Sequence, residues 1–305
     1  MIVFLFLVLF LTSSMAHAWG PATHLEYAGQ ALNSLILFAP LVKKLISKHQ
    51  DHFLYGVVAA DITLGKDLRG YLYNCHNWKV AYDLFENKAK DDSQKAFMLG
   101  YLAHLAADTV AHNFFIPYKM IRSWNTKLLN HVYWEMRFDL SVADKYWKMM
   151  GSFKDERYAK DDALLEGHLK RTFFSFRTNK KIFNSLLMIQ KLKHYKKLAL
   201  TYASKSVWKL SEHDIKNYKQ KAVASMVDFL KNFEKSYCLK ADPTGKLKIV
   251  YARDMVAQLR HASKVGTLTQ KGEHHFLQDV KEKFSTGIYE PVTFPLLQNY
   301  LSTNG

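Results

Sequence analysis

Apolar residues recur along this chain mainly at the three- and four-residue spacing of α-helices. Residues 96–118, "AFMLGYLAHLAADTVAHNFFIPY", are apolar almost all round and are expected to form a buried helix. Residues 221–238 place their apolar side chains on one face and their lysines elsewhere; that face comprises Val223, Met226, Val227, Leu230 and Phe233. Alternating strand patterns are rare, and no stretch resembles a linker. The pattern predicts an all-α protein with a single compact multi-helix domain over 19–305, irregular near 242–245 and in 289–297.

Three polar residues interrupt the apolar segment at intervals of four: His104, Asp108 and His112. Four residues advance an α-helix by about 400°, so the three side chains share one stripe. Because apolar residues fill the turns between them, the stripe faces a packed interior or a narrow cleft. An unpaired buried carboxylate is costly, and a counter-charge or a metal relieves that cost. The spacing alone therefore leaves two interpretations, a metal site or a buried aspartate hydrogen-bonded to two histidines.

The first 18 residues, "MIVFLFLVLFLTSSMAHA", have the form of a secretory signal peptide. An apolar core of about ten residues, half of what a membrane span needs, precedes small and polar residues and an A-x-A triplet ending at Ala18. No Lys or Arg precedes Lys43, so an uncleaved anchor is the alternative. We expect cleavage after Ala18, a mature chain that starts at Trp19, and export to the periplasm or the outside of the cell.

The net charge of +16 is concentrated in one part of the chain. Residues 167–211 contain many Lys and Arg, no Asp or Glu, and several interleaved aromatic residues. Such a segment attracts a polyanion, either an anionic lipid surface or nucleic acid. The alternative is a set of solvated basic helix faces whose aromatic residues belong to the core.

The chain has two cysteines, Cys75 and Cys238. In an exported protein they permit one disulfide, and two free buried thiols are the alternative.

Further metal-ligand residue types occur in four other segments. His131 and Glu135 repeat the spacing of four on another expected helix, and three more candidates stand alone in the sequence: His24, Asp61 and His76. Together with the stripe, these residues offer nitrogen and oxygen ligands from five segments. That combination suits zinc sites built from histidine and carboxylate.

The order of these residues resembles the zinc-dependent phospholipase C superfamily, which also contains single-strand nucleases. Its members are all-helical and exported, and the amino group and carbonyl of an amino-terminal tryptophan bind metal. The matching residue is Trp19, so the expected cleavage site and the implied ligand coincide. The resemblance covers roughly residues 19–140.

The resemblance implies up to three zinc ions per chain. Nine residues are implied as ligands: Trp19 and His24 on the first zinc with Asp108 bridging to the second, Asp61, His76 and His104 on the second, and His112, His131 and Glu135 on the third. Second-shell groups orient such imidazoles, and the candidates are Asn74, Asn77 and Asn113.

Two features depart from the better-known relatives. There the histidine after the bridging aspartate follows by six residues, whereas His112 follows Asp108 by four, the spacing of some bacterial branches. Ala60 precedes Asp61, at a position where the relatives often have a proline. This difference affects the shape of the loop and not the role of Asp61 as a ligand.

The resemblance implies hydrolysis of a phosphodiester by a zinc-activated water, with Asp61 as a ligand and candidate proton acceptor. The leading hypothesis is a phospholipase C that acts on a phospholipid or membrane surface and releases diacylglycerol and a phosphorylated alcohol. A single-strand nuclease is the first alternative, favoured by the basic segment 167–211. A non-catalytic, zinc-stabilised helical binding protein is the second. The sequence indicates no obligate protein partner.

Overall fold

The computed structural model describes residues 19–62, 76–126, 131–154, 156–168, 178–181, 201 and 206–302, and these contain helices and no strand. The α-helices are α2 (Pro21–Ala31), α3 (Pro40–Lys48), α4 (Gln50–Ala59), α5 (Trp78–Asp83), α6 (Asp92–Val110), α7 (Ile116–Arg122), α8 (His131–Asp139), α9 (Asp144–Met149), α10 (Ala159–His168), α13 (Glu212–Asn232), α14 (Lys246–Lys264) and α15 (Gln270–Thr286). The prediction of an all-α protein is confirmed. None of the described helices is both long enough and apolar enough to cross a membrane.

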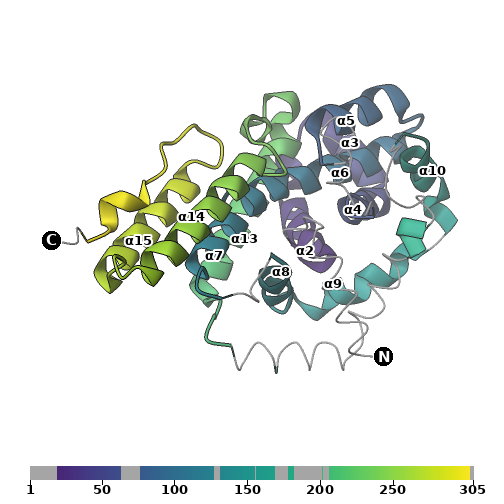
Figure 1. The fold of residues 1–305 in the computed structure, drawn as a ribbon. Helices are drawn as coiled ribbons and strands as arrows, with labels where there is room; N and C mark the ends of the chain where they lie inside the picture. Colours follow the sequence, from purple (N-terminus) through teal and green to yellow (C-terminus); the bar gives the residue numbers. More distant parts are fainter. Residues whose placement is uncertain are drawn as a thin grey trace.

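Helix α6 is the centre of the fold. Every residue from Ala96 to Val110 is buried, as expected for a helix that is apolar all round. The helix begins at Asp91, whose side chain accepts a hydrogen bond of 2.9 Å from the backbone N–H of Gln94. Helices α3, α4, α5 and α13 pack around it, while α14 and α15 pack on α7 at the far end of the molecule (Figure 1). This arrangement places the polar stripe of α6 in the interior.

Helices α4 and α6 cross at two glycines. A Cβ atom added to Gly56 would lie 1.9 Å from the carbonyl oxygen of Phe97, and one added to Gly100 would lie 1.9 Å from that of Phe53. These close approaches are to backbone atoms, which cannot rotate away. The two glycines therefore fix the distance between α4, which Asp61 follows, and α6, which carries His104 and Asp108.

We expect Gly100→Ala to lower the free energy of unfolding by about 3 kcal/mol, because overpacking at rigid backbone costs this much. Urea denaturation measures the effect. Gly167→Ala is the matched control, since no atom lies within 4 Å of an added Cβ there. Equal stability of the two variants would show that the close approach of α4 and α6 is wrong.

Helix α13 contains the amphipathic segment predicted from residues 221–238, but it ends at Asn232, and Phe233 follows with a positive φ of 47°. Its buried face includes Ala222, Met226 and Leu230. Residues 242–245 and 289–296 are irregular, as predicted.

Three sequence expectations concern parts of the chain outside the described residues. These are the signal peptide 1–18, Cys75 and most of the basic segment 167–211. Cys238 is a free, buried thiol with its Sγ 3.0 Å from the Oγ of Ser236.

Helix α10 is joined to α4 by a buried carboxylate. The Oδ2 of Asp161 lies 2.7 Å from the Nδ1 of His52, and Tyr55 donates a hydrogen bond of 2.5 Å to the Oδ1 of Asp162. Burial raises the pKa of Asp161 to about 7, although the hydrogen bond and charge of His52 oppose the shift. The folded state therefore binds more protons than the unfolded state between pH 4 and pH 7.

Because of that excess, the free energy of unfolding should fall as the pH rises through this window. Each pKa unit corresponds to about 1.4 kcal/mol, so Asp161 alone should account for a fall of up to about 3 kcal/mol between pH 5 and pH 7. Asp161→Asn should lose this part of the pH dependence. Parallel denaturation curves for the two proteins at each pH test it, and identical pH slopes would contradict the assignment.

Candidate metal centre

Four segments bring five of the predicted ligands together in the interior. The residues are His24 on α2, Asp61 directly after α4, His76 directly before α5, and His104 and Asp108 on α6, each at most 3 % exposed. Their ligand atoms form two overlapping groups that could each hold a metal ion: His24, His104 and Asp108 in one, and Asp61, His76 and His104 in the other.

Asp108 is the centre of the cluster. Its Oδ1 lies 3.3 Å from the Nε2 of His24. Its Oδ2 lies 3.1 Å from the Nε2 of His76 and 3.2 Å from the Nε2 of His104. The two oxygens of one carboxylate therefore face histidines of the two different groups, which is the arrangement of a bridging ligand.

Asp61 faces the two imidazoles of its own group. Its Oδ1 lies 3.4 Å from the Nε2 of His76 and 3.6 Å from the Nε2 of His104. The two imidazole nitrogens are themselves only 3.2 Å apart. Two ring nitrogens and a carboxylate oxygen thus point at one small region, as the ligands of a metal would.

The orientation of His104 fits metal binding. Its Nδ1 donates a hydrogen bond of 2.8 Å to the carbonyl oxygen of Val57, so in the neutral ring the Nε2 carries the lone pair. The Nδ1 of His24 makes no hydrogen bond to the described residues, its Nε2 lies 3.3 Å from the Oδ1 of Asp108, and its ring stacks on that of His104 at 3.8 Å. A buried ring nitrogen without a hydrogen bond is costly unless a ligand completes it.

The protonation states also fit. Burial, with the nearby His104, lowers the pKa of His24 to about 4, so its imidazole is neutral at physiological pH. Burial would raise the pKa of Asp108, but the charges of His104 and His112 outweigh it and hold this pKa well below its usual range. A neutral imidazole and an ionised carboxylate are the forms that bind zinc.

The helix changes its winding at His112, the last residue of the stripe. Helix α6 ends at Val110, and residues Ala111–Phe115 form one π-helical turn. The wider turn leaves the Nδ1 of His112 3.9 Å from Asp108 and 2.6 Å from the carbonyl oxygen of Pro243, to which it donates. His112 therefore still faces Asp108 and is buried like the other two residues of the stripe, at the start of a π-helical turn, a feature that is frequent at functional sites.

The turn at 242–245 is held against His112. Asn113 donates hydrogen bonds to the carbonyl oxygens of Thr109 at 2.9 Å and Asp242 at 2.8 Å. Gly245 is in the left-handed region, and an added Cβ would lie 2.1 Å from the carbonyl oxygen of His112. Asn113 thus holds Asp242, the residue before Pro243, whose own carbonyl oxygen accepts the hydrogen bond from His112.

The other two asparagine candidates differ from Asn113. Asn77 caps α5, where its Oδ1 accepts a hydrogen bond of 2.8 Å from the N–H of Lys79. Asn74 lies outside the described residues.

The third predicted ligand group is not assembled among the described atoms. Glu135 is half-buried on α8, and the side chain of His131 lies outside the description. Neither residue belongs to the groups of ligand atoms found near one another in the described part of the chain.

Trp19 is fully buried at the start of α2. Its ring lies 4.9 Å from that of Tyr27, 5.7 Å from that of Phe138 and 6.1 Å from that of Phe115, measured between centroids. The tryptophan that the sequence implies as a ligand is thus fixed one helical turn before His24.

Asp139 is a buried residue of this region that sequence reasoning missed. Its Oδ1 lies 2.5 Å from the Oγ1 of Thr23, and burial raises its pKa to about 7 against the hydrogen bonds from Thr23 and Gly20. The available signal was its position four residues after Glu135 on an expected helix.

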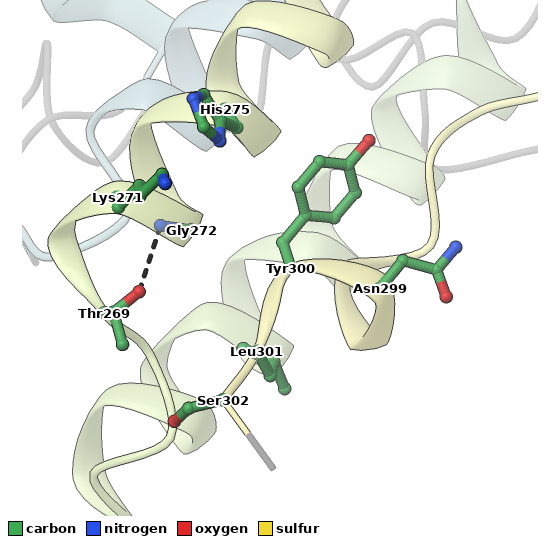
Figure 2. A pocket seen from close by; sticks show the side chains of 8 residues that line it. All are labelled: Thr269, Lys271, Gly272, His275, Asn299, Tyr300, Leu301 and Ser302. Carbon is green, nitrogen blue, oxygen red and sulfur yellow. Dashed lines mark hydrogen bonds between the residues drawn. The ribbon is translucent and has the colours of Figure 1, made fainter.

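A separate surface pocket lies at the beginning of α15 (Figure 2). Its lining includes Lys271, His275, Asn299 and Tyr300, and none of the predicted ligands. It is therefore distinct from the buried cluster.

Comparison with protein families matches residues 23–183 to the family described as zinc dependent phospholipase C. The match spans more than half of the 305 residues and includes every predicted ligand except Trp19. Neither the curated proteins nor the solved structures give a match. With buried His and Asp groups that could hold metal inside the matched region, the chain belongs to the zinc-dependent phospholipase C family of hydrolases.

Proposed function

We propose that this protein is a phospholipase C that hydrolyses the head-group phosphodiester of glycerophospholipids at a cluster of up to three zinc ions. The observation that carries the proposal is the carboxylate of Asp108, buried between His24 on one oxygen and His76 and His104 on the other. The family match supports the same chemistry.

The ligands would be divided as the resemblance implies. Three groups are proposed: the amino group and carbonyl of Trp19 with His24 and Asp108, then Asp61, His76, His104 and Asp108, and finally His112, His131 and Glu135. When bound there, zinc would supply an activated water and positive charge near the attacked phosphate.

The remaining chemistry is supplied by the protein. Asp108 holds the two groups together, and the carbonyl oxygens of Val57 and Pro243 fix the orientation of His104 and His112. Asp61 faces the same imidazoles and is proposed mainly as a ligand, because a carboxylate bound to a metal is a weak base. Its burial excludes bulk water from that side of the cluster.

The proposal includes export. Removal of residues 1–18 would create the amino group of Trp19 that serves as a ligand. The partner would be a phospholipid surface reached after export, and no protein partner is needed for the reaction.

The experiment is a comparison of substrates with the mature, zinc-loaded protein. Phosphatidylcholine vesicles and single-stranded DNA are incubated in parallel, with a chelator-treated sample as control. Diacylglycerol and phosphocholine, formed only by the zinc form, support the proposal. Cleavage of DNA alone would favour the nuclease suggested by the basic segment 167–211, and activity on neither substrate would favour a binding protein.

A further inference from the structure

Helix α8 presents a third polar position beyond the two implied as zinc ligands. His131 and Glu135 are followed at the same spacing by Asp139, the last residue of the helix. Asp139 is 4 % exposed and has no part in the proposed ligand groups. Its contacts point to another role.

The carboxylate of Asp139 binds the first turn of α2. It accepts hydrogen bonds from the backbone N–H groups of Gly20 and Thr23 and from the hydroxyl of Thr23. Helix α2 begins at Gly20 and has no capping side chain of its own. Asp139 therefore performs from another helix the function of an N-cap.

The fit around Gly20 is tight. A Cβ added to Gly20 would lie 1.9 Å from the Oδ2 of Asp139, so only glycine allows the carboxylate to come this close to the backbone. The peptide between Trp19 and Gly20 is thereby held from one side by the hydrogen bond from the N–H of Gly20 to Asp139.

The preceding residue is held by the neighbour of Asp139. The ring of Trp19 lies 5.7 Å from the ring of Phe138. Consecutive residues of α8 thus fix the indole of Trp19 and the N–H of the next residue. With both fixed, little rotation remains for the backbone nitrogen of Trp19, and His24 follows on the next turn of α2.

We propose that Asp139 is a positioning residue that directs the amino group of Trp19 toward the zinc site shared with His24 and Asp108. This rests on the proposed function, in which that amino group is a ligand. Asp139 is not itself a ligand, because its oxygens already accept hydrogen bonds from three donors of Gly20 and Thr23. Helix α8 would then contribute to the amino-terminal zinc site through Asp139 and to the third ligand group through His131 and Glu135.

The test measures, by competition with a chromophoric chelator, the affinity of the mature protein for the zinc proposed at Trp19, His24 and Asp108. That zinc is identified as the one whose affinity falls when an extra residue precedes Trp19. Asp139→Asn keeps the shape and removes the charge. We expect it to weaken that zinc by about 10- to 100-fold, the usual effect of changing a residue that orients a ligand. Asp161→Asn is the matched control, because Asp161 is also buried, contacts His52 and belongs to neither group of ligand atoms. It should change zinc affinity less than about twofold.

The same substitution in a second form of the protein distinguishes a positioning role of Asp139 from an effect on overall stability. One extra residue ahead of Trp19 removes the free amino group at that position. In this extended protein Asp139→Asn should cause no further loss of zinc affinity. An equal loss in both forms would overturn the positioning role, as would unchanged affinity in the mature protein.

Two further outcomes distinguish a failure of the proposed function from a failure of the role proposed for Asp139. If the extension alone leaves zinc binding unchanged, the amino-terminal ligand of the proposed function is wrong, and the role of Asp139 is wrong with it. If Asp139→Asn does not fold, Thr23→Val and Thr23→Ser replace it. The serine variant, which keeps the hydroxyl donor, should bind zinc like the wild type, and the valine variant should bind it more weakly. Equal binding by the two would overturn the inference.

Discussion

Replacing Asp108 by asparagine is expected to lower the hydrolytic activity more than about 100-fold, beyond what the loss of a second-shell partner causes. Asparagine has nearly the same shape but is neutral. Its amide NH2 would replace one of the two oxygens, either the one that faces His24 or the one that faces His76 and His104. Because both oxygens of Asp108 are involved, a single substitution disturbs both ligand groups. The loss of bound zinc should accompany the loss of activity.

Turnover of phosphatidylcholine and elemental analysis of zinc measure the two effects on the same preparation. Asp161→Asn serves as the control for removing a buried carboxylate elsewhere, and it should retain both zinc and activity. If Asp108→Asn keeps more than a tenth of the wild-type turnover, the bridging role is wrong.

Removal of zinc is expected to lower the melting temperature by about 10 °C. Without a cation, Asp61 and Asp108 are two buried carboxylates around the same pair of imidazoles. A ligand present at about 1,000 times its Kd stabilises the folded state by about 4 kcal/mol, and each kcal/mol corresponds to about 2–4 °C in a protein of this size. The metal thus supplies stability as well as chemistry.

Calorimetry with and without a chelator measures the shift, and added zinc should restore the original melting temperature. Added magnesium should not restore it, since imidazole ligands do not suit magnesium. Asp108→Asn should show a smaller response to the chelator. A wild-type protein that melts at the same temperature in both states would contradict the metal centre.

The sequence predicts the fold well where a helix carries its own pattern. The uninterrupted apolar run of α6 indicates a buried helix, and α13 shows a one-sided apolar face. The apolar pattern does not predict the end of α13, because the chain leaves the helix at Asn232 through an unusual backbone conformation at Phe233. No side-chain pattern marks that change in advance.

The candidate site could be predicted only in part. The spacing of His104 and Asp108 on one helix brings them together, and their grouping with His24, Asp61 and His76 followed from the resemblance. The π-helical turn at Ala111–Phe115 was not predictable from a spacing rule that assumes a regular α-helix.

Other features of the site depend on tertiary packing. The histidines are oriented by the backbone oxygens of Val57 and Pro243, and a carbonyl oxygen has no residue type to reveal it. Asp139 meets Gly20 only because α8 packs beside the start of α2. The contacts of the two histidines join residues 47 and 131 positions apart, and a single sequence does not record them.

The central claim is that the buried cluster around Asp108 is a zinc centre, and the number of bound zinc ions tests it most directly. The mature protein is loaded with zinc, dialysed against metal-free buffer and examined by elemental analysis. We predict two to three zinc ions per chain. Less than one zinc ion per chain in the folded protein would contradict the claim.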